Sequence, residues 1–538
     1  MVDGIGRASA FLASGTIVSR VLGFVKLIIL ARVIGQFGQG TDAFALANQL
    51  PNTVYVIVAG GVLTAVLVPQ IVRSAVHSDG GAGYINKLLT VAIVILAVTT
   101  LAATLLVPPL TTLVGGSFPN QGQLDLAIAL AYWCMPQIFF YGLYTVLGEV
   151  LNARRSFGPF TWVPVLNNVI AIAGLLVFSV MFGADPSGDR VSGDYTSAMI
   201  AVLAGSATLG VMVQALSLFF FWHRIGLRYR PDFRWRGVGL RATGKLAGWT
   251  FGMLLLTTIA GLVETRVVGG ASGDDASTNA LQTAWLVFML PHSVITVSIA
   301  TAYFTRMSEH VSFSRFAELR TDVSAAIRGT TLIIVLAAAV IGVCAYPMSA
   351  VFAQEFTQQI ALGNVIIGYI LGLVAFCILF VVQRAFYALG DTRTPFFFTL
   401  AQVVIVIIGV IGCSFLPLAW IAFGVAIVVT VSGVIQMLIA VLLLRRRLDG
   451  IDGRRVLRSL TVYAVAAIVP VIAGVLVLVA LGGTTDGGFA LSGIASAIVS
   501  MIVIGVTMTL LYAGGLILMR SRELQAFLTP VLARFRRG

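Results

Sequence analysis

Residues 19–69 read SRVLGFVKLIILARVIGQFGQGTDAFALANQLPNTVYVIVAGGVLTAVLVP and decide the fold of this chain. The first apolar run of the stretch contains Arg20 and Lys26, and the second is interrupted by Pro51. A charge inside the hydrocarbon of a bilayer costs several kcal/mol, so intramembrane charges usually face a cavity or a partner. The stretch therefore predicts a membrane transporter with a cationic pocket.

The composition of the whole chain is that of a polytopic membrane protein. Of 538 residues, 59% are hydrophobic and 10% are charged, and the mean hydropathy is +1.00. A soluble domain has about 25% charged residues, and a membrane-spanning helix needs about 20 apolar residues. We predict an all-α fold with fourteen spans at about 10–31, 43–72, 87–114, 124–148, 160–182, 197–222, 246–269, 279–303, 329–351, 362–387, 395–416, 418–444, 459–481 and 491–519.

The distribution of Lys and Arg predicts the orientation of these spans. With the N-terminus in the cytoplasm, all but five of the 34 Lys and Arg lie on or beside cytoplasmic segments, as the positive-inside rule requires. We expect a multi-pass membrane protein with both termini in the cytoplasm. The net charge of +13 then reflects topology and contact with anionic membrane lipids, and we expect no nucleic-acid partner.

The two halves of the chain are related by an offset of 240 residues. Pro51 corresponds to Pro291, and Lys26 corresponds to Arg266. A parallel repeat is typical of transporters in which two bundles rock around a central site, so the two prolines are candidate hinges. We predict an N-lobe of helices 1–6 over 1–222, a basic cytoplasmic linker over 223–245, a C-lobe of helices 7–12 over 246–444, and two further helices with a basic tail over 445–538.

Five more polar residues within or beside the spans are candidate substrate contacts. Asp42 follows Thr41 and is either an N-cap or a functional acid. Asn48 and Asn52 flank the proline of helix two, where they either line a pocket or satisfy the backbone of a static kink. Glu264 and Arg266 are two residues apart, so they point to different faces of their helix and do not form a simple mutual salt bridge. Each is either functional, or is neutralised by a neighbouring helix or snorkels towards the outside end of its span.

The sequence contains none of the motifs of a catalytic or metal centre. It has no Walker loop, no nucleophile elbow and no metal-ligand spacing of His and Cys. We therefore expect no enzyme activity and no cofactor, and transport would be driven by the membrane potential or by a monovalent cation. Asp391, in the turn after helix ten, is either a structural residue of that turn or a ligand of the coupling cation.

Several motifs together resemble one family of membrane proteins. SRVLGF at 19–24, TDAF at 41–44, LPN at 50–52 and YALGDTRTP at 387–395 have the order and spacing of the MurJ (MviN) family of lipid II flippases. The predicted 6+6+2 helices also match that family, within the larger group that includes the MATE exporters. The strong excess of Arg over Lys is typical of a high-GC genome, and we interpret the chain as a divergent, actinobacterial member.

The resemblance implies a flippase of the bacterial inner membrane that moves lipid II from the inner to the outer leaflet by alternating access. A cationic cavity would hold the diphosphate, and the last two helices would hold the lipid tail. Residue roles carry over for Arg20 and Asp42, and Lys26 stands where the family has Arg, while the basic residues after LPN are absent here. The alternatives are an exporter of another polyprenyl-linked glycan or of drugs, and a non-transporting scaffold for cell-wall synthesis proteins.

Overall fold

The structure, a computed structural model, describes residues 2–58, 82–154, 156–224, 227, 229–233, 244–273, 275–521 and 523–524. Every regular element in these ranges is helical, as predicted. Twelve segments are long and apolar enough to span a membrane, and they coincide with the third to fourteenth predicted spans. Two more helices, α1 (Val2–Ile34) and α2 (Gln39–Val58), precede them. Residues 59–72 of the predicted second span lie outside the described ranges, so the total of fourteen remains a prediction.

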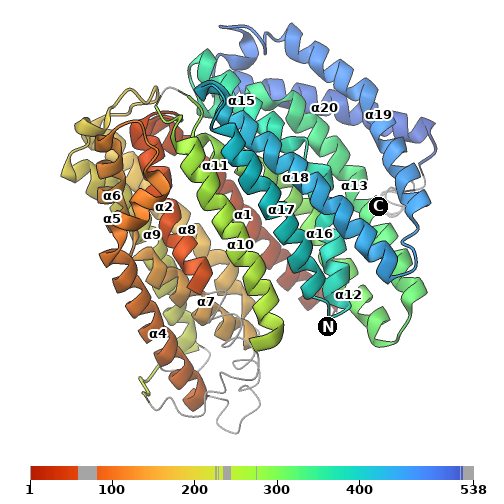
Figure 1. The fold of residues 1–538 in the computed structure, drawn as a ribbon, viewed down its shortest axis with the longest axis horizontal. Helices are drawn as coiled ribbons and strands as arrows, with labels where there is room; N and C mark the ends of the chain where they lie inside the picture. The colour runs from red at the N-terminus through yellow and green to blue at the C-terminus, as the bar shows by residue number, and fades with distance from the viewer. Residues whose placement is uncertain are drawn as a thin grey trace. The chain divides into compact units, whose positions relative to one another are not determined.

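The chain divides into two compact units, Met1–Asn279 and Ala280–Gly538. The predicted lobe boundary lay before residue 246, whereas the first unit also includes α10 (Gly244–Gly269), because α10 packs against α2 and α5. Most of the predicted linker at 223–245 lies outside the described ranges. The other helices of the first unit, drawn from red to yellow in Figure 1, are α4 (Ala82–Leu105), α5 (Val107–Gly115), α6 (Gln121–Cys134), α7 (Gln137–Ala153), α8 (Phe157–Phe182), η2 (Ser192–Asp194) and α9 (Ser197–Arg224).

Small residues let the helices of the first unit approach closely. A Cβ added at Gly174 of α8 would lie 2.1 Å from Cβ of Ser206 in α9. In the other direction, a Cβ added at Gly210 of α9 would lie 2.5 Å from Oδ1 of Asn167 in α8. Lipid offers no hydrophobic force between helices, so close packing and interhelical hydrogen bonds hold them together. Asn168 of α8 supplies one such bond, because its Nδ2 donates to the backbone oxygen of Ser19 in α1 at 2.9 Å.

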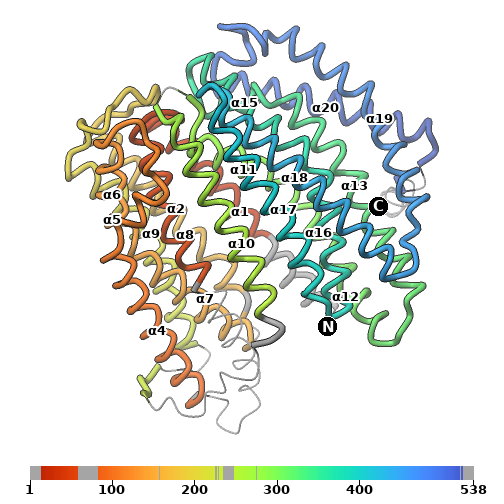
Figure 2. The backbone as a smooth tube through the Cα atoms, viewed as in Figure 1, coloured from red at the N-terminus to blue at the C-terminus, as the bar shows by residue number. Residues whose placement is uncertain are grey.

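The second unit contains the remaining helices, which Figure 2 traces from green to blue. The helix α11 begins at Thr278, immediately before the boundary, and a π-helical segment η3 connects it directly to α12. The elements are α11 (Thr278–Pro291), η3 (His292–Thr296), α12 (Val297–Ser312), α13 (Phe316–Val343), α14 (Ala345–Phe352), α15 (Phe356–Ile370), α16 (Leu373–Ala388), α17 (Arg393–Cys413), α18 (Leu418–Arg447), α19 (Gly453–Ala480), η4 (Phe489–Leu491) and α20 (Ile494–Leu518).

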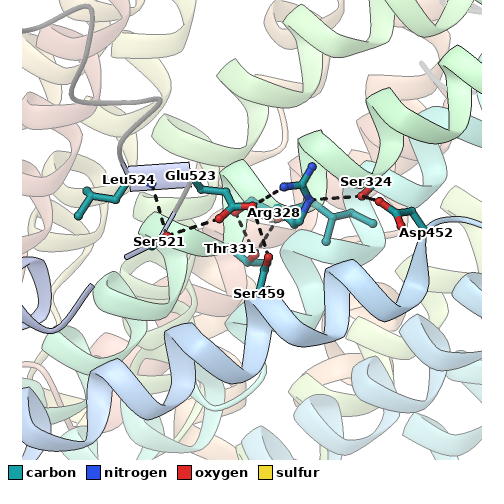
Figure 3. A network of polar contacts seen from close by, with 9 residues as sticks. Ser324, Arg328, Thr331, Asp452, Ser459, Ser521, Glu523 and Leu524 are labelled. Carbon is teal, nitrogen blue, oxygen red and sulfur yellow. Dashed lines mark hydrogen bonds and ion pairs between the residues drawn. The ribbon is translucent and has the colours of Figure 1, made fainter. Parts of the chain in front are cut away.

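The last two long helices are attached to α13 by a buried hydrogen bond and by a polar network. Tyr512 of α20 is buried and donates to the backbone oxygen of Leu332 in α13 at 3.0 Å. Figure 3 shows the network, in which buried Arg328 of α13 forms an ion pair with Glu523, just beyond α20. The Oε1 atom of Glu523 also accepts from Ser459 of α19 at 3.4 Å. One carboxylate thus connects α13, α19 and the segment after α20.

Candidate functional site

The two cations of α1 occupy different environments. The side chain of Arg20 is exposed, whereas Lys26 is half-buried. They are six residues apart, which places them about 9 Å apart along the axis and about 120° apart around it. No hydrogen bond or ion pair to Lys26 occurs in the part of the chain that the structure describes. Lys26 is therefore a cation within an apolar helix that lacks a protein counter-ion there.

The polar residues around the proline of α2 have separate roles. Pro51 is buried, and α2 continues through it without interruption up to Val58. Oδ1 of Asn48 accepts from Gln137 of α7 at 3.2 Å, so this amide connects two helices. Asn52 is exposed, and it forms no hydrogen bond with any described residue. Of the two asparagines, Asn52 is the one whose amide is available to a ligand.

Asp42 is the centre of a buried polar network at the predicted outer end of the first unit. The helix α2 begins at Gln39, so the predicted N-cap role of Asp42 is wrong. Its Oδ1 instead accepts from the backbone N–H of Asn279 at 2.9 Å, in the first turn of α11, and its Oδ2 accepts from Ser272 at 2.6 Å. Gln123 of α6 donates to the same serine at 2.6 Å. The carboxylate thus caps α11, which suits a negative charge at a helix N-terminus.

The charged pair in α10 is divided between two environments, as the spacing predicted. Glu264 is half-buried, and it forms no hydrogen bond or ion pair with any described residue. Arg266 is exposed, and its Nη1 donates to the backbone oxygens of Thr112, at 3.2 Å, and Leu113. A cation at the last carbonyls of a helix is stabilised by the helix dipole. Arg266 therefore caps α5, and the Nη1 of its guanidinium already has two backbone acceptors.

The second candidate hinge differs from the first in its backbone. Pro291 ends α11, and the π-helical segment follows it, with the N–H of Val297 bonded to the oxygen of His292. Such π segments are rare and mark places where a helix departs from regular geometry. His292 is buried there between the rings of Phe376 and Phe380, at centroid distances of 4.7 and 4.9 Å. The repeat therefore conserves the proline but not its local conformation.

The acid considered for a coupling cation is held in its turn. The two carboxylate oxygens of Asp391 accept from the backbone N–H of Thr394 at 2.9 Å and from its Oγ1 at 2.7 Å. This geometry caps the first turn of α17 and favours the structural interpretation. Among the described residues, no group of three or more His, Cys, Asp or Glu side chains is arranged to hold a metal ion.

Sequence reasoning missed the partners of Asp42. Gln123 comes from α6, whereas Ser272 and Asn279 come from one run at 271–279, and no spacing within the sequence relates them to Asp42. The one available signal is the run of small and polar residues in ASGDDASTN at 271–279, whose last two residues begin α11. Such a run predicts a loop and a helix start, but it does not predict which acid caps that helix.

Comparison with known proteins places the chain among lipid flippases. Residues 30–492 match the model of the family described as "Lipid II flippase MurJ". The chain is 23% identical over 413 residues to a probable lipid II flippase MurJ of Rickettsia prowazekii, covering 74% of this chain and 76% of that protein. It is 25% identical over 416 residues to the probable lipid II flippase MurJ of Vibrio cholerae, covering 72% and 74%.

Two solved structures share the fold. An inward closed conformation of lipid II flippase MurJ superposes with a TM-score of 0.72 at 18% identity, covering 94% of this chain and 99% of that one. An inward-facing multidrug resistance transporter of the MATE family superposes with a TM-score of 0.64 at 16% identity, covering 81% and 96%. At these identities the likeness establishes the all-helical transporter fold and not the cargo.

Proposed function

Because this chain belongs to the lipid II flippase MurJ family, we propose that it translocates lipid II from the inner to the outer leaflet of the bacterial inner membrane. Family membership rests on the match over residues 30–492. Alternating access by rocking of two lobes is the mechanism that the transporter fold supports. The family is one of transporters, which agrees with the lack of catalytic motifs in the sequence.

The environment of Lys26 is the observation that best supports a binding site for an anionic cargo. Its ammonium lies within an apolar helix, half-buried, and finds no counter-ion among the described residues. A buried charge without a partner is costly, so a ligand that brings a negative charge to it gains a large interaction energy. The diphosphate of lipid II supplies such a charge.

We propose a narrower cargo site than the sequence indicated. Arg20, Lys26 and Asn52 provide two cations and an exposed amide, which suit a diphosphate and its sugars. Asp42, Asn48 and Arg266 are engaged with other helices, so we propose that they position the elements around the site.

Coupling to the membrane potential or to a monovalent cation remains part of the proposal. Glu264 is the better candidate for a coupling acid, because it has no described partner, whereas both oxygens of Asp391 are occupied by Thr394. Collapsing the potential with valinomycin, and replacing Na⁺ with choline, should separate the two sources of energy.

Replacing Lys26 tests the cargo site. Lys26→Met removes one charge-assisted contact, worth about 1.5–3 kcal/mol, so lipid II affinity should fall about tenfold or more. Lys26→Arg should retain function because it restores a cation. Cells depleted of the native protein and supplied with Lys26→Met should accumulate lipid II in the inner leaflet, as measured by accessibility to an external modifying enzyme.

Lys87→Met is the matched control. Lys87 is also half-buried and has no described partner, but it lies near the start of α4, at the predicted cytoplasmic boundary. It should support normal wall synthesis. Normal flipping by well-expressed Lys26→Met would refute the proposed site and would favour the scaffold alternative, because a scaffold has no need of an intramembrane cation.

Beyond its cargo, we propose two further classes of partner. Membrane lipids would contact the basic predicted cytoplasmic ends of the helices. Cell-wall synthesis proteins would bind the predicted cytoplasmic loops, and co-purification from cross-linked cells would test this.

A further inference from the structure

A basic pocket lies in the second unit, at the end of the hairpin formed by α17 and α18. Its volume is about 600 Å³, and Arg393, Arg446 and Arg447 contribute three cations to its wall. Phe386, Phe397 and Leu443 contribute apolar surface. The proposed cargo site does not include any of these residues.

The arginines are presented to the pocket by two different helices. Arg393 begins α17, and its guanidinium lies over the ring of Phe397 at 5.6 Å from the centroid. Arg446 and Arg447 belong to the last turn of α18, and neither forms a hydrogen bond or ion pair with any described residue. Both side chains are exposed. The two guanidinium groups of α18 are thus available to an external anion.

The single acid in the pocket wall offsets only one of the three positive charges. Both oxygens of Asp391 accept hydrogen bonds from Thr394, at 2.9 and 2.7 Å. With three arginines and one carboxylate, the wall carries a net charge of 3 − 1 = +2. Arginine is suited to phosphate because its planar guanidinium donates two parallel hydrogen bonds to adjacent oxygens.

An exposed apolar surface leads away from the pocket along α17. Phe397, Val404, Ile408 and Ile411 are all exposed and follow a spacing of seven, four and three residues, which places them on one face of the helix. A ligand that suits both features has a phosphate at one end and a hydrocarbon chain at the other. By the positive-inside rule, the distribution of Lys and Arg predicts that this end of the hairpin lies on the cytoplasmic side of the membrane.

We propose that this pocket binds the phosphate headgroup of an anionic glycerophospholipid of the inner leaflet, with an acyl chain along α17. The pocket shares no residue with the proposed cargo site, and the proposal does not depend on which lipid the protein flips.

The test measures binding of fluorescent phosphatidylglycerol to the purified full chain in an uncharged detergent, with phosphatidylcholine as the reference lipid. Phosphatidylglycerol should bind saturably and more tightly. The double variant Arg446→Gln, Arg447→Gln should bind it roughly 25-fold more weakly, since each arginine near an anionic lipid contributes about a fivefold factor. Arg445→Gln is the matched control, because Arg445 is exposed in the same turn but does not line the pocket. It should change binding by less than about twofold.

A second variant keeps the test decisive if the double variant is poorly folded. Leu443→Glu retains all three arginines but places a carboxylate three and four residues before Arg446 and Arg447, within reach of both. It should weaken phosphatidylglycerol binding by a similar factor.

Three outcomes would overturn the proposal. An effect of Arg445→Gln equal to that of the double variant would mean general surface attraction. Displacement of the fluorescent lipid by millimolar inorganic phosphate would indicate a site for free phosphate. Displacement by a polyprenyl diphosphate, at concentrations where unlabelled phosphatidylglycerol does not compete, would assign the pocket to the cargo.

Discussion

Replacing Glu523 with glutamine should loosen the attachment of the segment after α20 to α13. Arg328 is 7% exposed and depends on Glu523 for its counter-ion, with a further bond from its Nε to Ser324 at 3.3 Å. Removing one partner of a buried ion pair costs about 3–5 kcal/mol, because the other charge stays buried without compensation. The side chain of Glu523 is 19% exposed, which favours the lower end, about 3 kcal/mol.

Replacing the other partner of the ion pair, Arg328, should cost less free energy of attachment. Arg328→Gln leaves Glu523 near the surface, where water, Ser459 and the charge of Arg455 still stabilise the carboxylate. We expect about 1–2 kcal/mol for this change. The double variant should cost less than the sum of the two single variants, because the pair is coupled.

The pH dependence of the attachment has a definite sign. Burial raises the pKa of Glu523, but hydrogen bonds and the charges of Arg328 and Arg455 outweigh this effect and hold the pKa below its ordinary value of 4.5. A carboxylate with a lowered folded pKa contributes stability that is complete above its unfolded pKa and is lost as pH falls through the folded pKa. The attachment should therefore be insensitive to pH from neutral down to about 5 and should weaken below about 4.5.

Amide hydrogen exchange of residues 519–524 measures this attachment directly. A loss of about 3 kcal/mol in the free energy of local opening should speed exchange by roughly 150-fold in Glu523→Gln. Glu318→Gln is the matched control, because Glu318 is an exposed acid in the first turn of α13, the helix of Arg328, and has no described partner. Equal exchange in the two variants would refute the role assigned to the ion pair.

Two other predictions concern topology and packing. Ala184→Cys, in the loop after α8, should react with a membrane-impermeant thiol reagent in intact cells, whereas Ser312→Cys, at the end of α12, should react only after lysis; both positions are exposed, and the four native cysteines are buried. The opposite pattern would invert the orientation. Gly174→Leu should lower the melting temperature of the purified protein through an overpacking cost of about 1–3 kcal/mol, because its Cβ would lie 2.1 Å from Cβ of Ser206. Gly433→Leu, where nothing lies within 4 Å of the added Cβ, should melt like the wild type, and equal losses in the two variants would contradict the packing argument.

The helices themselves were predictable from local properties of the sequence. Twelve spans coincide with predicted apolar runs, because a helix that crosses a bilayer must satisfy its own backbone and present about 20 apolar residues to lipid. The charged residues within the predicted apolar runs could also be identified from the sequence, because each interrupts a run of apolar residues. Lys26 and Glu264 have no described partner, and their position within the runs had already made them candidates for the site.

The partners of the polar residues depended on the tertiary structure. Asp42 caps α11 through Asn279, 237 residues away, and Arg266 binds the end of α5, more than 150 residues away. Both residues had the character of cargo ligands in the sequence. The repeat also paired Pro51 with Pro291, yet only the second is followed by a π-helical segment within the described ranges.

The physical reason is that hydropathy depends on residues adjacent in the sequence, whereas a hydrogen bond depends on atoms adjacent in space. Hydropathy is a sum over neighbouring residues, so a window of the sequence determines whether a segment enters the membrane. A hydrogen bond or a helix cap requires atoms within about 3 Å of each other, and in this chain those atoms come from helices far apart in the sequence. Folding alone decides whether a charge within a span is satisfied by the protein, as at Asp42 and Arg266, or has no described partner, as at Lys26.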